Sequence, residues 1–189
     1  MTEQRKRRDA LRVVPGGKDP AARLGPVLVV VASPERPPFP VEALVLEEDT
    51  FLVLSAEPAV VDPPEEPMRL MTRLIETRPA TPGSVLVRGR DPVRMLSVVH
   101  DVNREPSWRE TWVARALERA LDEAEQRGMR SVGLEMLGCV HGRLDPARFA
   151  SLLKAALARL APRKVRRIWL MPSRKRKPGE IGRFLREAP

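Results

Sequence analysis

The segment 137–144 (Leu-Gly-Cys-Val-His-Gly-Arg-Leu) contains residue types that bind anions or act as nucleophiles. It follows a β-like run at 130–136 and precedes an amphipathic stretch that begins at Asp145. A strand, a loop with two glycines and a helix start form the usual geometry of a phosphate site. Glycines let backbone N–H groups approach the anion, and the first helical turn adds unpaired donors. The segment therefore predicts a cradle for a phosphate-bearing ligand.

Six residues of this loop form the predicted phosphate-binding site: Gly138, Cys139, Val140, His141, Gly142 and Arg143. The guanidinium group of Arg143 can donate charge-assisted hydrogen bonds to a phosphate. The alternative is that the glycines only close a tight connection between strand and helix. A thiolate–imidazole pair of Cys139 and His141 is a further hypothesis. The sequence assigns no group to orient this imidazole, which favours an incidental role for both residues.

Two other groups of polar residues have the types found in active sites. Glu47, Glu48 and Asp49 can act as paired carboxylates or bind a metal ion, but their place between two apolar runs indicates the charged tip of a hairpin. His100 and Asp101 end a predicted strand, where a histidine is most often a hydrogen-bonded core residue. We therefore predict neither catalytic residues nor a metal site.

Basic residues gather at the two ends of the chain. Residues 1–25 contain seven Lys and Arg against three acids, and residues 163–189 contain ten against two, whereas residues 26–162 contain 17 against 20. The near-neutral body argues against a broad nucleic-acid surface on the domain itself.

Four of the basic residues fit contacts with nucleic-acid phosphates best: Arg174, Lys175, Arg176 and Lys177. The pairs at 163–164 and 166–167 extend this cluster, and residues 5–8 are its N-terminal counterpart. Such clusters bind phosphates without reading the base sequence. The alternative is a solvated tail.

The composition excludes several classes of protein. No apolar run approaches the roughly 20 residues that span a membrane, and 42% apolar residues is too many for a disordered chain. One cysteine and two histidines are too few for a structural zinc site. The charged start lacks the apolar core of a signal peptide, so we expect a cytoplasmic protein without a cofactor.

Apolar periodicity predicts the elements that must position these residues. Strands are predicted at 26–32, 41–46, 51–55, 85–87, 94–99, 130–136 and 165–171, and helices at 68–78, 107–128 and 145–160. The second and third strands are expected to form a hairpin. Ser107 and Glu110 match a capping box, and Asp145 matches an N-cap. Trp108 and Trp112, one helical turn apart, are predicted to pack in the core rather than to stack on bases.

Strands that alternate with helices predict an α/β domain. The expected architecture is a three-layer α/β/α sandwich with a mixed sheet of six or seven strands. Residues 25–172 are predicted to form this domain. Residues 1–24 are predicted to be a basic flexible leader and residues 173–189 a basic tail.

Four stretches, in this order, resemble the macro domain, a fold that binds ADP-ribose and related nucleotides. Residues 41–46 resemble its second strand, residues 82–85 and 95–102 its paired strands, and residues 131–142 its strand and phosphate loop. Leu46 stands where the family carries an asparagine, and no glycine follows it before the next matching stretch, so the family's triple-glycine loop has no counterpart.

The resemblance implies a non-catalytic module that recognises ADP-ribose or another phosphate-bearing nucleotide through residues 138–143. The alternative is a macro-like scaffold that contacts protein or nucleic acid through its basic ends. A hydrolase of ADP-ribosyl adducts would need the missing asparagine to position a water molecule, so catalysis is not expected. The sequence does not indicate an oligomeric state.

Overall fold

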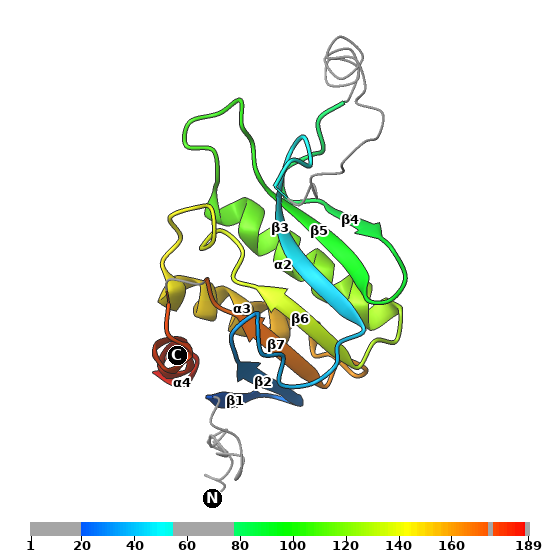
Figure 1. Cartoon of the computed structure of the whole chain (residues 1–189), viewed down its shortest axis with the longest axis vertical. Helices are drawn as coiled ribbons and strands as arrows, with labels where there is room; N and C mark the ends of the chain where they lie inside the picture. Colours follow the sequence, from blue (N-terminus) through cyan, green and yellow to red (C-terminus); the bar gives the residue numbers. More distant parts are fainter. Residues whose placement is uncertain (1–19, 55–77, 174–175, 188–189) are drawn as a thin grey trace, which may run out of the picture.

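The computed structural model describes residues 20–54, 78–173 and 176–187, which form a twisted seven-stranded sheet with three helices (Figure 1). The strands are β1 (Ala21–Leu24), β2 (Val27–Val31), β3 (Ala43–Asp49), β4 (Val85–Arg88), β5 (Val93–His100), β6 (Ser131–Glu135) and β7 (Arg167–Met171). The helices are α2 (Glu110–Gln126), α3 (Pro146–Leu160) and α4 (Pro178–Glu187). The strand order is β1-β2-β7-β6-β3-β5-β4.

The sheet is mixed, as predicted. The five central strands run parallel to one another, while β1 and β4 at the two edges are antiparallel to their neighbours. The predicted hairpin is wrong, because residues 43–49 form the single strand β3, which pairs in parallel with β5 and β6. The three acids expected at a hairpin tip, residues 47–49, therefore lie at the end of a central strand.

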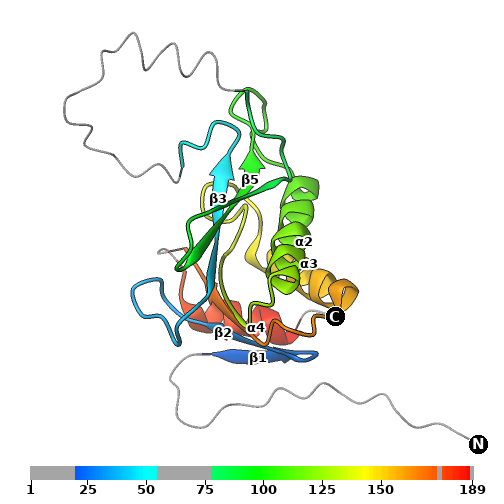
Figure 2. The ribbon, with the colours of Figure 1, turned by 90° about the vertical axis from the view of Figure 1, so that its right-hand side faces the viewer.

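All three helices pack against the same side of the sheet. α2 packs on β4, β5 and α3, and α4 packs on α3, β1 and β2; Figure 2 shows α2 and α3 side by side on this face. Leu117, Phe149 and Ile181 of the three helices join Leu134 and Ile168 of the sheet in one fully buried cluster. Burial of each such side chain contributes about 1.5–3 kcal/mol. None of the described helices has the length and apolar character needed to cross a membrane.

The opposite face is covered, in the described part of the chain, by the segment 33–42. Phe39 and Val41 from this segment pack near Trp169 and Met171. The indole N–H of Trp169 donates a 3.0 Å hydrogen bond to the carbonyl oxygen of Ala32. The connection from β2 to β3 therefore runs over one face of the sheet, while α2 and α3 cross over the other. The helix predicted at 68–78 lies outside the described residues.

The structure moves two predicted domain boundaries. Ala21–Leu24, assigned to the leader, forms the edge strand β1 on β2. Residues 178–187, assigned to the basic tail, form α4, in which Ile181 and Leu185 are buried in the core. Charged residues flank these apolar positions, and a helix of ten residues presents only one apolar stripe to the core. The high charge of the segment concealed this stripe in the sequence.

The start of α3 follows the predicted capping chemistry, whereas the start of α2 does not. Asp145 Oδ1 accepts hydrogen bonds from the N–H groups of Ala147 and Arg148 at 2.9 and 3.2 Å, so Asp145 caps α3. The capping box predicted at Ser107 is wrong. α2 begins at Glu110, and its N-cap residue makes no side-chain hydrogen bond.

The two tryptophans near the start of α2 have different surroundings. Trp108 is partly buried and packs against the main core, as predicted. Trp112 is also partly buried, and the guanidinium group of Arg109 lies 5.2 Å from its ring centroid. A cation over an indole ring is a stabilising contact, so neither ring stands free as a stacking platform for bases.

Candidate functional site

The predicted phosphate loop joins β6 to α3 at the edge of the sheet where the parallel strands end (Figure 1). Its backbone N–H groups converge on the carboxylate of Glu47 from β3. Gly138 N–H donates to Oε2 at 2.9 Å, and His141 N–H donates to Oε1 at 3.1 Å. Val140 N–H makes a longer contact of 3.4 Å to Oε2. The loop therefore does surround an anion, but this anion is one of the protein's own side chains.

Glu47 is positioned by the alternation of side chains along β3. Ala43 and Val45 face the helices, and Glu47, two residues further on, points the same way into the loop. Nε2 of His100 on β5 also hydrogen-bonds Oε1 of Glu47. The carboxylate is 3% exposed, and these bonds offset the cost of burying it. The hydrogen-bonded core position predicted for His100 agrees with this arrangement.

The donors expected to hold a ligand phosphate are thus engaged inside the protein. The N–H groups of residues 138, 140 and 141 face Glu47, and those of the first turn of α3 face Asp145. Three of the six predicted site residues line an open cavity instead: Cys139, Gly142 and Arg143. A ligand in this cavity would therefore contact these residues rather than the N–H groups bonded to Glu47.

Both glycines of the loop also have a backbone role, as the alternative interpretation proposed. Gly138 has φ +77°, which favours glycine. A Cβ atom at Gly142 would collide with the carbonyl oxygen of Gly138, which accepts a 3.0 Å hydrogen bond from Leu144 N–H. Any side chain at Gly142 would therefore force the loop to rearrange.

The other two acids of β3 stabilise the turn that follows the strand. Asp49 accepts hydrogen bonds from the N–H groups of Phe51, Val53 and Leu54, and Glu48 also accepts from Leu54. Both acids are buried, at 0–2% exposure, rather than solvated as predicted. No set of three or more His, Cys, Asp or Glu side chains in the described part of the chain is arranged to hold a metal ion.

Glu135, at the end of β6, is the carboxyl group whose ionisation the surroundings oppose most clearly. Beyond Val45 the strands β3 and β6 no longer pair, and the Glu135 carboxylate accepts a 2.7 Å hydrogen bond from Glu47 N–H in the gap. Burial raises the pKa of Glu135, and the negative charges of Glu47 and Glu48 raise it further against the lowering effect of that hydrogen bond.

Cys139 lacks the properties of a nucleophile. Burial, followed by the negative charges of Glu47 and Asp145, raises the pKa of its thiol from 9.0 to about 12. A thiolate is the reactive form of cysteine, so almost none is present at neutral pH. The ring of His141 stands edge-on to that of His100, with 6.3 Å between the centroids. The incidental role favoured for Cys139 and His141 therefore fits the structure.

Two adjoining cavities open at this edge of the sheet. One, of about 230 Å³, lies between residues 142–146, Cys139 and the segment after β7. The other, of about 320 Å³, lies between residues 33–35 after β2 and residues 172, 173 and 176–178 after β7. Ser173 and Arg176 line both cavities, so we describe them together as the edge cleft. Their volumes fall near the range of about 300–1,000 Å³ typical of small-molecule sites.

The edge cleft lies where the topology of the sheet predicts a binding crevice. β2 and β7 are parallel neighbours, yet the chain leaves them toward opposite faces: residues 33–42 over one, and α4 over the other. Connections that diverge from adjacent strands leave a gap above their carboxyl ends, which is where open α/β sheets bind ligands. The second cavity occupies this gap.

Three cations and two carboxylates, those of Glu35 and Asp145, line the edge cleft. Arg143 projects from the loop, and Arg176 and Lys177 precede α4. All three are exposed, and Arg176 Nη1 lies 2.9 Å from Oε1 of Glu180. Of the four basic residues predicted to contact nucleic acid, Arg176 and Lys177 line the cleft, whereas Arg174 and Lys175 lie outside the described residues.

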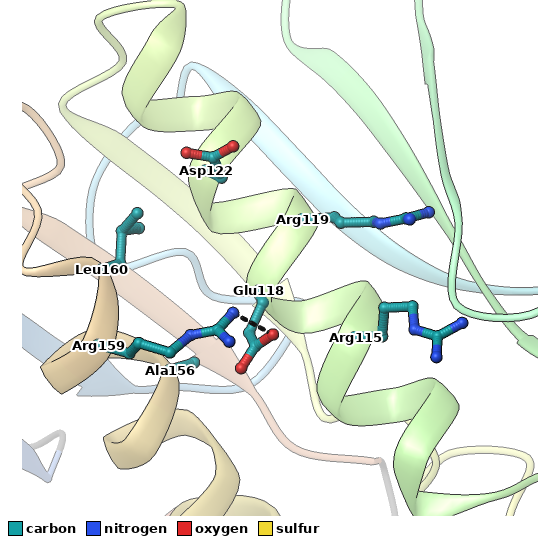
Figure 3. Close-up of a pocket in the computed structure, with 7 residues that line it drawn as sticks. All are labelled: Arg115, Glu118, Arg119, Asp122, Ala156, Arg159 and Leu160. Carbon is teal, nitrogen blue, oxygen red and sulfur yellow. Dashed lines mark ion pairs between the residues drawn. The ribbon is translucent and has the colours of Figure 1, made fainter.

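A third cavity, of about 320 Å³, lies far from the strand ends, in a groove between α2 and α3 (Figure 3). Arg159 of α3 and Glu118 of α2 point toward one another across it and form an ion pair. Arg115 and Arg119 extend from α2, and Asp122 adds a second acid. With three cations and two carboxylates, this groove has the same balance of charge as the edge cleft. It lies between two helices, whereas the cleft lies at the carboxyl ends of the parallel strands, where open α/β sheets bind ligands.

The residues of the edge cleft that the sequence did not reveal are Ser33, Glu35 and Ser173. Each follows a predicted apolar strand, which is the signal available in the sequence. That signal becomes specific only when β2 and β7 are known to be neighbours. The strand order that makes them neighbours skips four strands along the chain.

Comparison with known proteins identifies the fold. No family model and no curated protein sequence matches the chain. Among solved structures, an Oceanobacillus iheyensis macrodomain with ADP is 10% identical, with a TM-score of 0.63 over 90% of this chain and 94% of its own. The macrodomain of Mycobacterium tuberculosis DarG is 19% identical, with a TM-score of 0.56 over 78% and 99%. The macrodomain of Thermus aquaticus DarG is 21% identical, with a TM-score of 0.54 over 76% and 97%. The chain therefore has the macrodomain fold.

Proposed function

We propose that this protein is a non-catalytic binding module that recognises ADP-ribose, or a similar nucleotide with a diphosphate, in the edge cleft. The observation that carries the proposal is the pair of adjoining cavities at the switch point of the sheet, which share Ser173 and Arg176 and are lined by Arg143 and Lys177. A solved structure of the same fold is described as a macrodomain with ADP, which supports a ligand of this class.

In this proposal the guanidinium groups hold the diphosphate. Arg143 and Arg176 reach the first cavity from opposite elements, the loop and the segment before α4. Guanidinium forks make paired, charge-assisted hydrogen bonds to phosphate oxygens. The second cavity, between residues 33–35 and residues 172, 173 and 176–178, has room for a nucleoside and offers the hydroxyl group of Ser173 to its polar atoms. The hydroxyl group of Ser33 donates to the Glu35 carboxylate.

A binding role is supported over catalysis by the state of the polar groups around the cleft. The thiol of Cys139 stays protonated because its pKa is about 12. The carboxylates of Glu47 and Asp49 are held by backbone N–H groups. Leu46 stands where the resemblance would place the asparagine that positions water. Turnover of an ADP-ribosylated substrate by the purified protein would contradict the non-catalytic part of the proposal.

Calorimetric titration with ADP-ribose tests the proposal. The full chain should bind with saturation, and Arg143→Ala and Arg176→Ala should each weaken binding by about tenfold, because a hydrogen bond to a charged group contributes about 1.5–3 kcal/mol. Arg166→Ala is the matched control: it removes the same charge from an exposed residue that precedes β7, at the opposite end of that strand. Equal affinity for all four proteins would reject the edge cleft. A glycine substitution is unsuitable, since a side chain at Gly142 collides with the backbone.

The second candidate function, nucleic-acid contact through the basic ends, shares two residues with the first. Arg176 and Lys177 line the edge cleft, so a phosphate of either ligand class can meet them. Deleting residues 173–189 would not separate the two functions, because that segment contains Ile181 and Leu185 of the core. Deleting residues 1–19 leaves every described residue in place and tests the N-terminal cluster alone.

A further inference from the structure

The edge of the sheet opposite the cleft gathers positive charge from separate parts of the chain. Six residues, which we call the basic edge, lie where the parallel strands begin: Arg23, Arg130, Arg163, Lys164, Arg166 and Arg167. All six are exposed. In Figure 1 this edge lies at the lower right of the sheet, where β3, β6 and β7 begin.

Strand register sets the spacing of two of these residues, Arg23 and Arg167, and the guanidinium group of Arg167 lies 4.7 Å from the ring centroid of Phe39. Arg23 pairs with Leu28, Leu28 with Arg167, and Arg167 with Ser131, the neighbour of Arg130. The N–H groups of Arg166 and Arg167 both donate to the carbonyl oxygen of Arg130. Since neighbouring strands lie about 4.8 Å apart, the row from β1 to β6 spans about 15 Å.

Two acids, Glu42 and Glu125, lie among the six cations and offset part of their positive charge. Glu42 accepts hydrogen bonds from the N–H groups of Arg130 and Ser131 at 2.5 and 2.9 Å. Glu125 accepts from the N–H groups of residues 163–165 at 2.7–3.0 Å. Both carboxylates are directed at backbone rather than at the guanidinium groups. The side chains of Arg163 and Arg166 have no partner within the described residues.

The surroundings favour a polyanion over a membrane. The exposed large apolar side chains of the described chain are Val53, Leu54 and Val102. All three follow the carboxyl ends of β3 or β5, away from the basic edge. A membrane-binding surface needs apolar groups that insert beside its cations. A group of six cations spread along about 15 Å instead suits repeated phosphates.

We propose that the basic edge binds the phosphate backbone of nucleic acid, without reading its sequence. The cations come from β1, from the α2–β6 loop, and from the α3–β7 loop with the first residue of β7, so the fold brings Arg23 and Arg130 to the charged run at 163–167. This surface is separate from the edge cleft and does not depend on the function proposed for it. It includes the pairs at 163–164 and 166–167, which the sequence groups with residues 174–177, but it does not include residues 174–177.

Fluorescence anisotropy with a labelled, mixed-sequence DNA duplex at a series of salt concentrations tests this proposal. The full chain should bind at low salt, with an affinity that falls linearly with salt on a double-logarithmic plot. Reversing two charges, in the double variant Arg163→Glu and Arg166→Glu, should weaken binding by about tenfold or more and lower the salt slope by about 2. The neutral double variant Arg163→Gln and Arg166→Gln should lie between the two.

The matched control reverses two other exposed arginines, Arg115→Glu and Arg119→Glu, on the face of α2 seen in Figure 3. These changes alter the net charge equally and should leave binding within about threefold, since phosphate contacts act at short range. Removing residues 1–19 should leave the loss caused by the edge variant unchanged.

The proposal would be overturned if the full chain bound no duplex at low salt, or if removal of residues 1–19 alone abolished binding. It would also be overturned if the edge and control variants lost affinity equally, or if the edge variant bound like the full chain. Capture by phosphatidylserine vesicles without binding to the duplex would likewise reject nucleic acid as the partner. Far-UV circular dichroism of each variant verifies that the fold is retained.

Discussion

At the scale of single residues, Glu47 does inside this protein what a ligand phosphate does in other glycine loops. Its carboxylate collects the N–H groups of Gly138, Val140 and His141 together with His100. The N–H groups of the loop therefore already have an acceptor within the protein. Side chains such as Arg143, rather than these N–H groups, must supply the contacts to a ligand that binds nearby.

Replacing Glu47 should destabilise the protein. Glu47→Ala leaves buried N–H donors without an acceptor, and each unsatisfied donor costs about 1–3 kcal/mol. We expect the free energy of unfolding in urea to fall by about 3 kcal/mol or more, with a smaller loss for Glu47→Gln, which retains one carbonyl oxygen. A loss below about 0.5 kcal/mol for Glu47→Ala, as at an ordinary surface site, would contradict the role assigned to this carboxylate.

The thiol of Cys139 should react slowly. With a pKa of about 12, against about 8.5 for free cysteine, its thiolate fraction at pH 8 is lower by at least about a hundredfold. Alkylation by iodoacetamide, followed by mass spectrometry, should be correspondingly slow in the folded chain and fast in urea. Equal rates in the two conditions would show that the thiol is neither buried nor surrounded by negative charge.

Glu135 should make the protein less stable as the pH rises from acid to neutral. Its pKa is higher in the folded chain than its ordinary value of 4.5, so the folded state binds this proton more tightly. The stability contributed by the proton is present below about 4.5 and is lost as the pH rises through the folded value. Glu135→Gln keeps an acceptor for Glu47 N–H and removes the charge. Urea unfolding should show this variant to be the more stable one at pH 7, with a difference that shrinks toward pH 4. A difference independent of pH would contradict the assignment.

At the scale of elements, the spacing of apolar residues predicted strands and helices correctly where a segment shows a single apolar pattern. β6, α3 and β7 were predicted within a few residues of their observed bounds, because their apolar stripes and the Asp145 cap are unambiguous. β3 was predicted too short and in the wrong pairing. The acidic residues at its end favour a turn in the sequence. They extend the strand in the structure because backbone N–H groups that are distant in sequence, those of Gly138 and His141, donate to the Glu47 carboxylate.

The helix α4 should be required for stability despite its charge. Leu185→Ala removes a buried side chain from the contact with α3, β1 and β2, and such changes cost about 2–5 kcal/mol. Arg186→Ala, at the next and exposed position, is the control and should change stability by less than about 0.5 kcal/mol. Thermal unfolding distinguishes the two. Equal melting temperatures for Leu185→Ala and the unmodified chain would mean that α4 does not pack as described.

At the scale of the whole molecule, the sheet separates two surfaces. The edge cleft lies at the carboxyl ends of the five parallel strands, and the basic edge lies at their amino ends. The sequence predicted the macrodomain fold and one wall of the cleft, the loop that contains Gly142 and Arg143. It could not predict the other wall, because Ser33 and Ser173 become neighbours only through the β2–β7 pairing. Four of the six residues of the basic edge already stand out in the sequence as the pairs at 163–164 and 166–167, but their approach to Arg23 and Arg130 depends on the fold.

The most direct test of the central claim is nuclear magnetic resonance of the backbone amides during titration with ADP-ribose. We predict that the amides of Ser33, Glu35, residues 142–145, Ser173, Arg176 and Lys177 shift on binding. Those of Gly138, Val140 and His141 should be protected from hydrogen exchange in the free protein and should stay so, because Glu47 remains their acceptor. The account would be contradicted if no amide shifted at saturating ADP-ribose. It would also be contradicted if the largest shifts and a loss of the Glu47 contacts occurred at residues 138–141.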